Sequence, residues 1–275
     1  MKSLLKISSI IAAFLIFSTG IALSAENPTT PVLAPGYSPE LDRNGVLEQA
    51  NEFYRNGDLP KALSGYQYLT ALGIKNGYLF YNLGNAYFRE GNLGSAILWY
   101  ERALLYLPRF HDLNINYQYA RTILADEEFK APEYSGTLGF LIHINQKFNL
   151  RECLIITGVF LWLFLTILII RMFLENQSFR SRLSIPCWVV GFAFIIFFSS
   201  SVFKVYQHES IRQAIVMAPA VEVKTGPGND FSTSFSIHEG TKVKLLQDQG
   251  DWVRVLLPGN TTFTGWMLKS TVEAI

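Results

Sequence analysis

The chain has 275 residues, of which 49% are hydrophobic and only 16% are charged, and its formal net charge at pH 7 is +1. Soluble domains carry about 25% charged residues, so this composition excludes a wholly soluble protein. The net charge near zero gives no support for nucleic acid as a partner, because nucleic-acid-binding domains present a basic patch.

The shortage of charge is concentrated in three uncharged runs, at residues 7–25, 153–170 and 183–203. The first run follows two lysines and ends in small residues, which is the pattern of a secretory signal peptide over residues 1–25. An uncleaved signal anchor is the alternative. Three runs are too few for a polytopic transporter, which needs more spans.

A 34-residue internal repeat follows a Pro-rich segment at 26–42, which is predicted to be a linker. Residues 43–76 align on residues 77–110 without gaps, and the equivalent positions share their character. Gly57 and Gly91 are each predicted to end the first helix of their repeat. The equivalent pairs are Ala50/Gly84, Phe53/Tyr87, Gly57/Gly91, Ala62/Ala96 and Tyr66/Tyr100.

These residues resemble the tetratricopeptide repeat. The resemblance implies two stacked helical hairpins, because one repeat cannot bury its own apolar face. Residues 112–129 are predicted to form a capping helix with its apolar residues on one face, so that the array covers residues 43–129. The second repeat matches the pattern closely at Leu83, Gly84, Tyr87, Ala96, Tyr100, Ala103 and Pro108.

The resemblance implies a binding groove lined by the first helix of each pair. Asn51 and Asn85 occupy positions where some family members clamp a terminal carboxylate, but Leu47, Ile115 and Tyr119 replace the basic residues of that clamp. We therefore predict an aromatic-lined groove for an apolar or extended segment. The alternative is that the asparagines only bond neighbouring backbone. By family position the groove carries Asn44, Leu47, Asn51, Tyr54, Arg55, Tyr78, Tyr81, Asn85, Arg89, Ile115 and Tyr119.

Two transmembrane helices are predicted at 153–174 and 183–203, because runs of this length span the hydrocarbon core of a bilayer. The arginine-rich loop at 175–182 is predicted to be cytoplasmic by the positive-inside rule. An export signal followed by two spans then places both soluble parts outside the cytoplasm. The connector at 130–152 is predicted to include an interfacial helix at 139–150, with a core segment as the alternative.

From residue 213 onward the apolar period changes to two, which predicts short strands separated by Gly, Pro, Asn and Asp turns. Residues 213–275 resemble the bacterial SH3-like domain, a family that binds cell-wall peptides or protein segments. Trp252 and Trp266 are candidates to stack on a ligand, although a place in the barrel core is favoured. The resemblance is carried by residues 223–228, Gly240, Trp252, Val253, Val255, Gly265 and Trp266.

No nucleotide-binding, metalloprotease or serine-hydrolase motif is present in the sequence. The two cysteines, Cys153 and Cys187, lie in the apolar runs, which excludes a disulfide scaffold for the soluble parts. We therefore expect no enzymatic activity, no cofactor and no metal site. The predicted fold is multidomain, with an α-helical solenoid, a transmembrane hairpin and a small all-β SH3-like barrel.

This order of parts is similar to the BatE family of the Bacteroides-aerotolerance (Bat) operons. Members accompany membrane-anchored von Willebrand factor A proteins and a MoxR-type ATPase, and they are linked to tolerance of oxygen or oxidative stress. The resemblance implies a periplasm-facing adaptor in the bacterial inner membrane that holds partner proteins, von Willebrand factor A domain Bat proteins among them. The alternative is an envelope sensor or cell-wall module whose SH3-like domain binds peptidoglycan.

Overall fold

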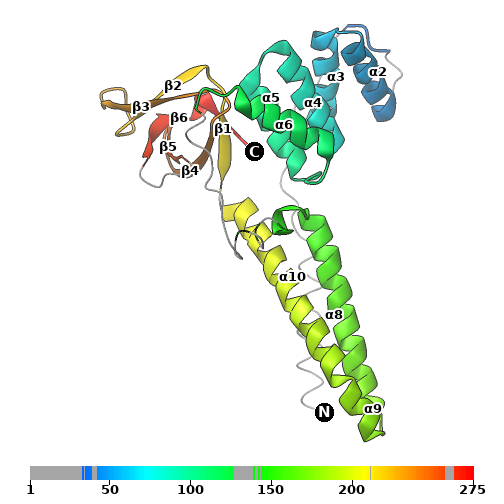
Figure 1. Cartoon of the computed structure of the whole chain (residues 1–275). Helices are drawn as coiled ribbons and strands as arrows, with labels where there is room; N and C mark the ends of the chain where they lie inside the picture. The colour runs from blue at the N-terminus through cyan, green and yellow to red at the C-terminus, as the bar shows by residue number, and fades with distance from the viewer. Residues whose placement is uncertain are drawn as a thin grey trace. The chain divides into compact units, whose positions relative to one another are not determined.

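The chain folds into a helical solenoid, a long helical hairpin and a small antiparallel β domain, as the sequence predicts (Figure 1). The predicted signal peptide at 1–25 lies outside the described residues, and the predicted linker and connector are described only in part. Residues from Leu33 onward form one compact unit. The computed structural model describes residues 33, 35–38, 42–126, 139, 142, 144–210, 212–257 and 263–275.

The solenoid is built from helix pairs that correspond to the two sequence repeats, followed by a further helix. Each helix of the two pairs begins after an Asp or Asn whose side chain accepts a backbone N–H, which satisfies one of the free donors at a helix start. These capping residues are Asp42, Asp58, Asn76 and Asn92. The helices are α2 (Arg43–Arg55), α3 (Leu59–Ala71), α4 (Gly77–Glu90), α5 (Leu93–Leu104) and α6 (His111–Thr122).

The glycines of the repeat have two separate roles. Gly84 allows close packing, since a Cβ atom at this position would lie 2.4 Å from the ring of Tyr100. Gly91 ends α4 with a φ of 86°, and Gly57 follows α2 with a φ of 82°. Glycine adopts this left-handed conformation without a Cβ clash. The prediction that Gly57 and Gly91 end the first helix of each pair is confirmed.

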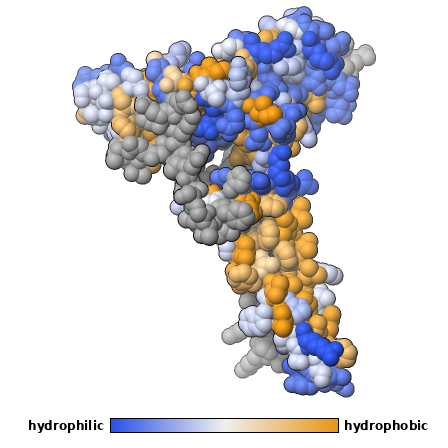
Figure 2. Space-filling model, in the orientation of Figure 1, coloured by the Kyte–Doolittle hydropathy of each residue, from blue (hydrophilic) through white to orange (hydrophobic). Residues whose placement is uncertain are grey.

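The hairpin consists of α8 (Leu150–Phe173), α9 (Gln177–Arg182) and α10 (Ser184–Ser210). The segments Leu150–Phe173 and Gln177–Tyr206 are long and apolar enough to cross a membrane. Their large apolar side chains point outward, and Figure 2 shows a hydrophobic surface over this part of the molecule. The α8/α10 contact instead buries small or polar side chains, including those of Cys153, Thr157 and Ser201.

The β domain (residues 212–275) is one antiparallel sheet with the strand order β3-β2-β6-β5-β4-β1-β7. Side chains alternate between the core and the surface, most clearly in β2 and β5. The core contains Val223, Ile237, Val253, Val255 and Met267. The strands are β1 (Gln213–Val216), β2 (Ala220–Lys224), β3 (Thr233–His238), β4 (Lys242–Gln249), β5 (Trp252–Leu256), β6 (Thr264–Leu268) and β7 (Val272–Ala274).

Candidate protein-binding groove

The predicted groove residues lie on α2, α4 and α6, the first helix of each repeat and the helix that follows the second. Three of them expose more than half of an apolar or aromatic side chain, with exposed fractions of 55% for Tyr78, 52% for Ile115 and 60% for Tyr119. Half-buried groove residues are Leu47, Asn51, Tyr54, Tyr81 and Asn85, and the exposed polar ones are Asn44, Arg55 and Arg89.

Asn51 is held by hydrogen bonds from two other elements. Its Oδ1 accepts a hydrogen bond from the Tyr66 hydroxyl on α3 at 2.8 Å and another from Asn82 Nδ2 on α4 at 2.9 Å. The contact joins both helices of the first repeat to the next repeat. The Asn51 Nδ2 group makes no hydrogen bond with the described residues, so its two donors remain available.

The same arrangement recurs 34 residues later. Asn85 Oδ1 accepts from the Tyr100 hydroxyl at 2.7 Å and from Asn116 Nδ2 at 2.9 Å. Asn116 also donates to the Tyr81 hydroxyl at 3.0 Å. Sequence reasoning missed Asn82 and Asn116, although their spacing of 34 residues matches the repeat period.

Asn51, Tyr66 and Asn82 form one hydrogen-bonded triad, and Asn85, Tyr100 and Asn116 form the second. In both triads the tyrosine hydroxyl is the donor. Burial raises the pKa of Tyr66 and of Tyr100 well above the ordinary value of 10.0. The hydroxyls are therefore protonated at neutral pH, and the oxygen atoms of Asn51 and Asn85 are occupied. The asparagines bond neighbouring side chains rather than backbone, and they present only N–H groups to a ligand. Such groups match the carbonyl oxygens of an extended peptide.

Aromatic side chains surround the second triad. The ring of Phe110 makes edge contacts with Tyr78 at 5.3 Å and with Tyr81 at 5.2 Å between centroids. Phe88 makes an edge contact with Tyr119 at 5.7 Å. These geometries are favourable for aromatic pairs, so the rings pack against one another without a ligand.

The first repeat is more polar than the second. Arg89 lies over the Tyr54 ring at 4.7 Å and donates to the Tyr54 carbonyl at 2.9 Å, so this groove residue ties the two repeats together. A hollow of about 480 Å³ opens beside α2, and of its lining residues only Asn51 and Arg55 belong to the predicted groove. The exposed apolar side chains of the groove, Tyr78, Ile115 and Tyr119, lie on α4 and α6, and none lies on α2.

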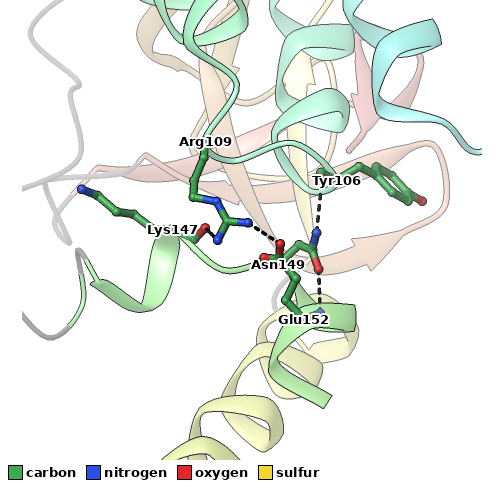
Figure 3. A network of polar contacts seen from close by, with 5 residues as sticks. All are labelled: Tyr106, Arg109, Lys147, Asn149 and Glu152. Atoms are coloured by element: carbon green, nitrogen blue, oxygen red, sulfur yellow. Dashed lines mark hydrogen bonds and ion pairs between the residues drawn. The ribbon is translucent and has the colours of Figure 1, made fainter. Parts of the chain in front are cut away.

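The turn between α5 and α6 attaches the solenoid to the start of α8 (Figure 3). Arg109 forms an ion pair with Glu152 and donates to the Lys147 carbonyl at 3.2 Å. Asn149 Nδ2 donates to the Tyr106 carbonyl at 3.1 Å. The first turn of α8 is thus bound to the second repeat, a connection that sequence patterns did not indicate.

The α8 end of this attachment is fixed by a capping box. Asn149 Oδ1 accepts from the Glu152 backbone N–H at 2.8 Å, and Glu152 Oε2 accepts from the Asn149 N–H at 3.0 Å. The Arg109 guanidinium also lies over the Phe148 ring at 5.4 Å, and that ring contacts Phe197 of α10. Arg109 therefore contacts the segment that leads into the hairpin in two ways, by its ion pair with Glu152 and by its contact with the Phe148 ring.

The two tryptophans of the β domain lie on adjacent strands. Trp266 on β6 is only 9% exposed, and it pairs with Arg254 of β5 and with Lys224 of β2. Trp252 on β5 is half-buried and pairs with Leu268. Trp266 is therefore buried but does not belong to the hydrophobic core of the β domain, whereas Trp252 keeps part of its ring accessible.

Residues 77–110 match the tetratricopeptide repeat family. These are the residues of α4, α5 and the turn that bears Arg109. No curated protein matches the chain. Among the described residues, no group of three or more His, Cys, Asp or Glu side chains is placed to hold a metal ion.

Proposed function

We propose that the protein is a membrane-anchored adaptor that binds an extended segment of a partner protein in the groove of α2, α4 and α6. The observation that carries the proposal is the combination of three exposed apolar side chains, Tyr78, Ile115 and Tyr119, with Asn51 and Asn85. The Oδ1 atoms of these asparagines accept hydrogen bonds, and their Nδ2 groups have no hydrogen-bond partner among the described residues. The apolar side chains supply contact area. The amides supply hydrogen-bond donors for the backbone carbonyl groups of the bound extended segment, which are not paired with another strand.

The hairpin serves as the anchor in this proposal. Two helices of sufficient length and apolarity come after the solenoid in the chain, and their exposed faces carry large apolar side chains. An even number of spans keeps the solenoid and the β domain on one side of the membrane. With a signal peptide at 1–25, that side is the periplasm of a bacterial inner membrane. The physiological setting proposed is a Bat-type complex that serves aerotolerance or resistance to oxidative stress.

Site-specific photocrosslinking in cells tests the groove. A photoreactive residue at Tyr119 is expected to capture a discrete partner, whereas the same residue at the exposed loop position Lys75 is not. The adduct at Tyr119 is expected to decrease when Asn85→Asp removes the free amide donors. Equal capture at both positions, or an adduct that Asn85→Asp does not affect, contradicts a groove-bound partner.

The partner is then identified by mass spectrometry of the adduct. A von Willebrand factor A domain Bat protein is the expected identity for a Bat-type complex. Recovery of a different protein from the groove leaves the adaptor role intact but removes the Bat assignment. Retention of the intact protein on peptidoglycan, lost on Trp252→Ala, is the result that favours the alternative cell-wall role.

A further inference from the structure

Strand β1 of the β domain is buried on both of its faces. Ala214 and Val216 belong to the core of the β domain, whereas Ile215 between them belongs to the core of the solenoid. All three are 0% exposed. Because successive side chains of a strand point to opposite faces, one strand is shared by two cores. Met217 and Ile275 also pack against the solenoid core.

A buried ion pair lies beside this strand. Glu101 of α5 is 9% exposed and binds Lys242 of β4 at 2.9 Å. The Tyr117 hydroxyl of α6 donates to the other carboxylate oxygen at 2.5 Å. Burial opposes ionisation of Glu101, but the Lys242 charge and these hydrogen bonds outweigh it and lower its pKa. A lone charge at this place would be strongly destabilising, so the solenoid face requires Lys242.

The segment after α6 is held by the turn between β3 and β4. Asp126 accepts hydrogen bonds from the His238 backbone N–H and from the Thr241 hydroxyl, both at 2.6 Å. A third contact joins Asp126 to His238 Nδ1 at 2.8 Å. The Leu124 side chain lies close to Gly240, where a Cβ atom would be 2.4 Å away. The β3–β4 turn therefore binds the segment after α6 through both its backbone and its side chains.

The start and the end of α5 are held in the same way. The Gly94 N–H donates to the Glu239 carboxylate at 3.2 Å, in the first turn of α5. Arg102, in its last turn, binds the Glu273 carboxylate at 2.9 Å and the Ala274 carbonyl at 2.6 Å. One face of α5 is thus covered along its length by β1, the β3–β4 turn and the C-terminal strand.

We propose that the β domain is the C-terminal cap of the solenoid and that the two parts fold as one unit. Two repeats are fewer than the three or more that such arrays need, and terminal repeats require a cap. The β domain covers the end face of α5 and α6, where a further helix would otherwise pack. This inference is independent of the proposed function. Its consequence is that the end face is closed to partners, whereas the groove of α2, α4 and α6 stays open.

An engineered disulfide tests the contact in the full-length chain. A Cβ atom at Gly94 would lie 3.5 Å from the Glu239 Cβ atom, which is within the range of disulfide geometry. Gly94→Cys with Glu239→Cys is expected to form an intramolecular crosslink in membranes upon mild oxidation. The two single variants are the controls, because they contain only Cys153 and Cys187 besides the new thiol.

Any result of the disulfide experiment other than an intramolecular crosslink overturns the proposal. A crosslink between two chains would mean that the β domain caps a second copy, and the absence of any crosslink in a folded double variant would mean that the domains separate. Because the Gly94 Cβ atom would also lie 3.1 Å from the Val216 carbonyl oxygen, a second test avoids this position.

The second test compares Ile215→Ala with Leu246→Ala in the full-length chain. Ile215 is fully buried against the solenoid, whereas Leu246 is 50% exposed on β4. Hydrogen exchange of the α5 and α6 amides is expected to accelerate about tenfold or more in Ile215→Ala, since loss of a buried Ile side chain shifts the opening equilibrium by at least that factor. No acceleration, or the same acceleration in Leu246→Ala, overturns the proposal.

Discussion

The α4/α5 pair of the solenoid and the α8/α10 pair of the hairpin are both packed helix pairs, yet they bury opposite kinds of side chain. The solenoid pair buries large residues such as Leu83, Ile97 and Tyr100. The hairpin pair buries Thr157 and Ser201, whose hydroxyl oxygens lie 3.2 Å apart, and it exposes its largest apolar side chains. The difference is the one expected if water surrounds the solenoid and lipid surrounds the hairpin, because water drives apolar residues inward and lipid does not.

The largest expected effect comes from placing the same charge on both surfaces. Trp162 of α8 is 67% exposed and Tyr119 of α6 is 60% exposed. Trp162→Arg is expected to impair membrane insertion by about 3 kcal/mol, since a charge in mid-span is costly in lipid. Tyr119→Arg is expected to leave folding unchanged. Membrane fractionation of the two variants measures this, and equal recovery of both would mean that α8 is not exposed to lipid.

The next largest effect is expected from adding a methyl group at a glycine of each helix pair, which should destabilise the solenoid pair and not the hairpin pair. A Cβ atom at Gly84 would lie 2.4 Å from the Tyr100 ring, whereas one at Gly158 of α8 has nothing within 4 Å. Gly84→Ala is expected to lower the free energy of unfolding of the solenoid by about 1–3 kcal/mol. Gly158→Ala serves as the control and should not destabilise the protein. Thermal unfolding followed by circular dichroism tests both, and a neutral Gly84→Ala contradicts the packing described.

Acid is expected to weaken the contacts of Glu101 in the solenoid and to leave the Thr157–Ser201 contact of the hairpin unchanged. The pKa of Glu101 is lower in the folded protein than its ordinary value of 4.5. Its stabilising contribution is therefore present above pH 4.5 and is lost as the pH falls through the lowered value. Protection of the α5 and α6 amides against exchange, measured relative to the intrinsic exchange rate at each pH, should fall in this range, and Glu101→Gln should reduce this dependence on pH. Thr157 and Ser201 carry no group that titrates there, so their contact across the hairpin is expected to be insensitive to this change of pH.

The smallest effect is expected from the hydroxyls of the hairpin. Thr157 contacts Ser201 across the helix pair, whereas Thr166 donates only to the Trp162 carbonyl of its own helix. Thr157→Ala is expected to weaken the helix pair by about 0.6 kcal/mol, which is typical of such contacts in membranes. Thr166→Ala is the matched control. Unfolding of the hairpin in detergent measures both, and a larger loss in Thr166→Ala contradicts the assigned pairing.

The sequence allowed the repeats, the hairpin and the strands to be predicted because each depends on local periodicity. The spacing of 34 residues between Gly57 and Gly91 indicates two turns of the same kind, and the two uncharged runs at 153–170 and 183–203 indicate a pair of long apolar helices. The groove residues were predicted by family position, and Asn51 and Asn85 do lie on the first helix of each repeat. Their partners Asn82 and Asn116 repeat at the same interval and were detectable in principle.

The contacts between parts were not predictable in this way. Glu101 lies 141 residues from Lys242 along the chain, and Arg109 lies 43 residues from Glu152. No period relates such residues, and a single charge on a helix usually faces water. The burial of Glu101 depends on a neighbour that only the folded chain supplies. The sequence therefore suggested two separate soluble domains, whereas Ile215 of the β domain belongs to the core of the solenoid.

In the proposed topology the hairpin crosses the membrane, and the solenoid and the β domain lie together on its outer side. Labelling with a membrane-impermeant maleimide tests it directly, using Lys75→Cys in the solenoid, Asp251→Cys in the β domain and Ser181→Cys in α9, all at exposed positions. In cells from which only the outer membrane has been removed, the reagent is expected to label Lys75→Cys and Asp251→Cys. Ser181→Cys is expected to react only after the inner membrane is permeabilised. Labelling of Lys75→Cys and Asp251→Cys from opposite sides, or of all three from the same side, would contradict the account.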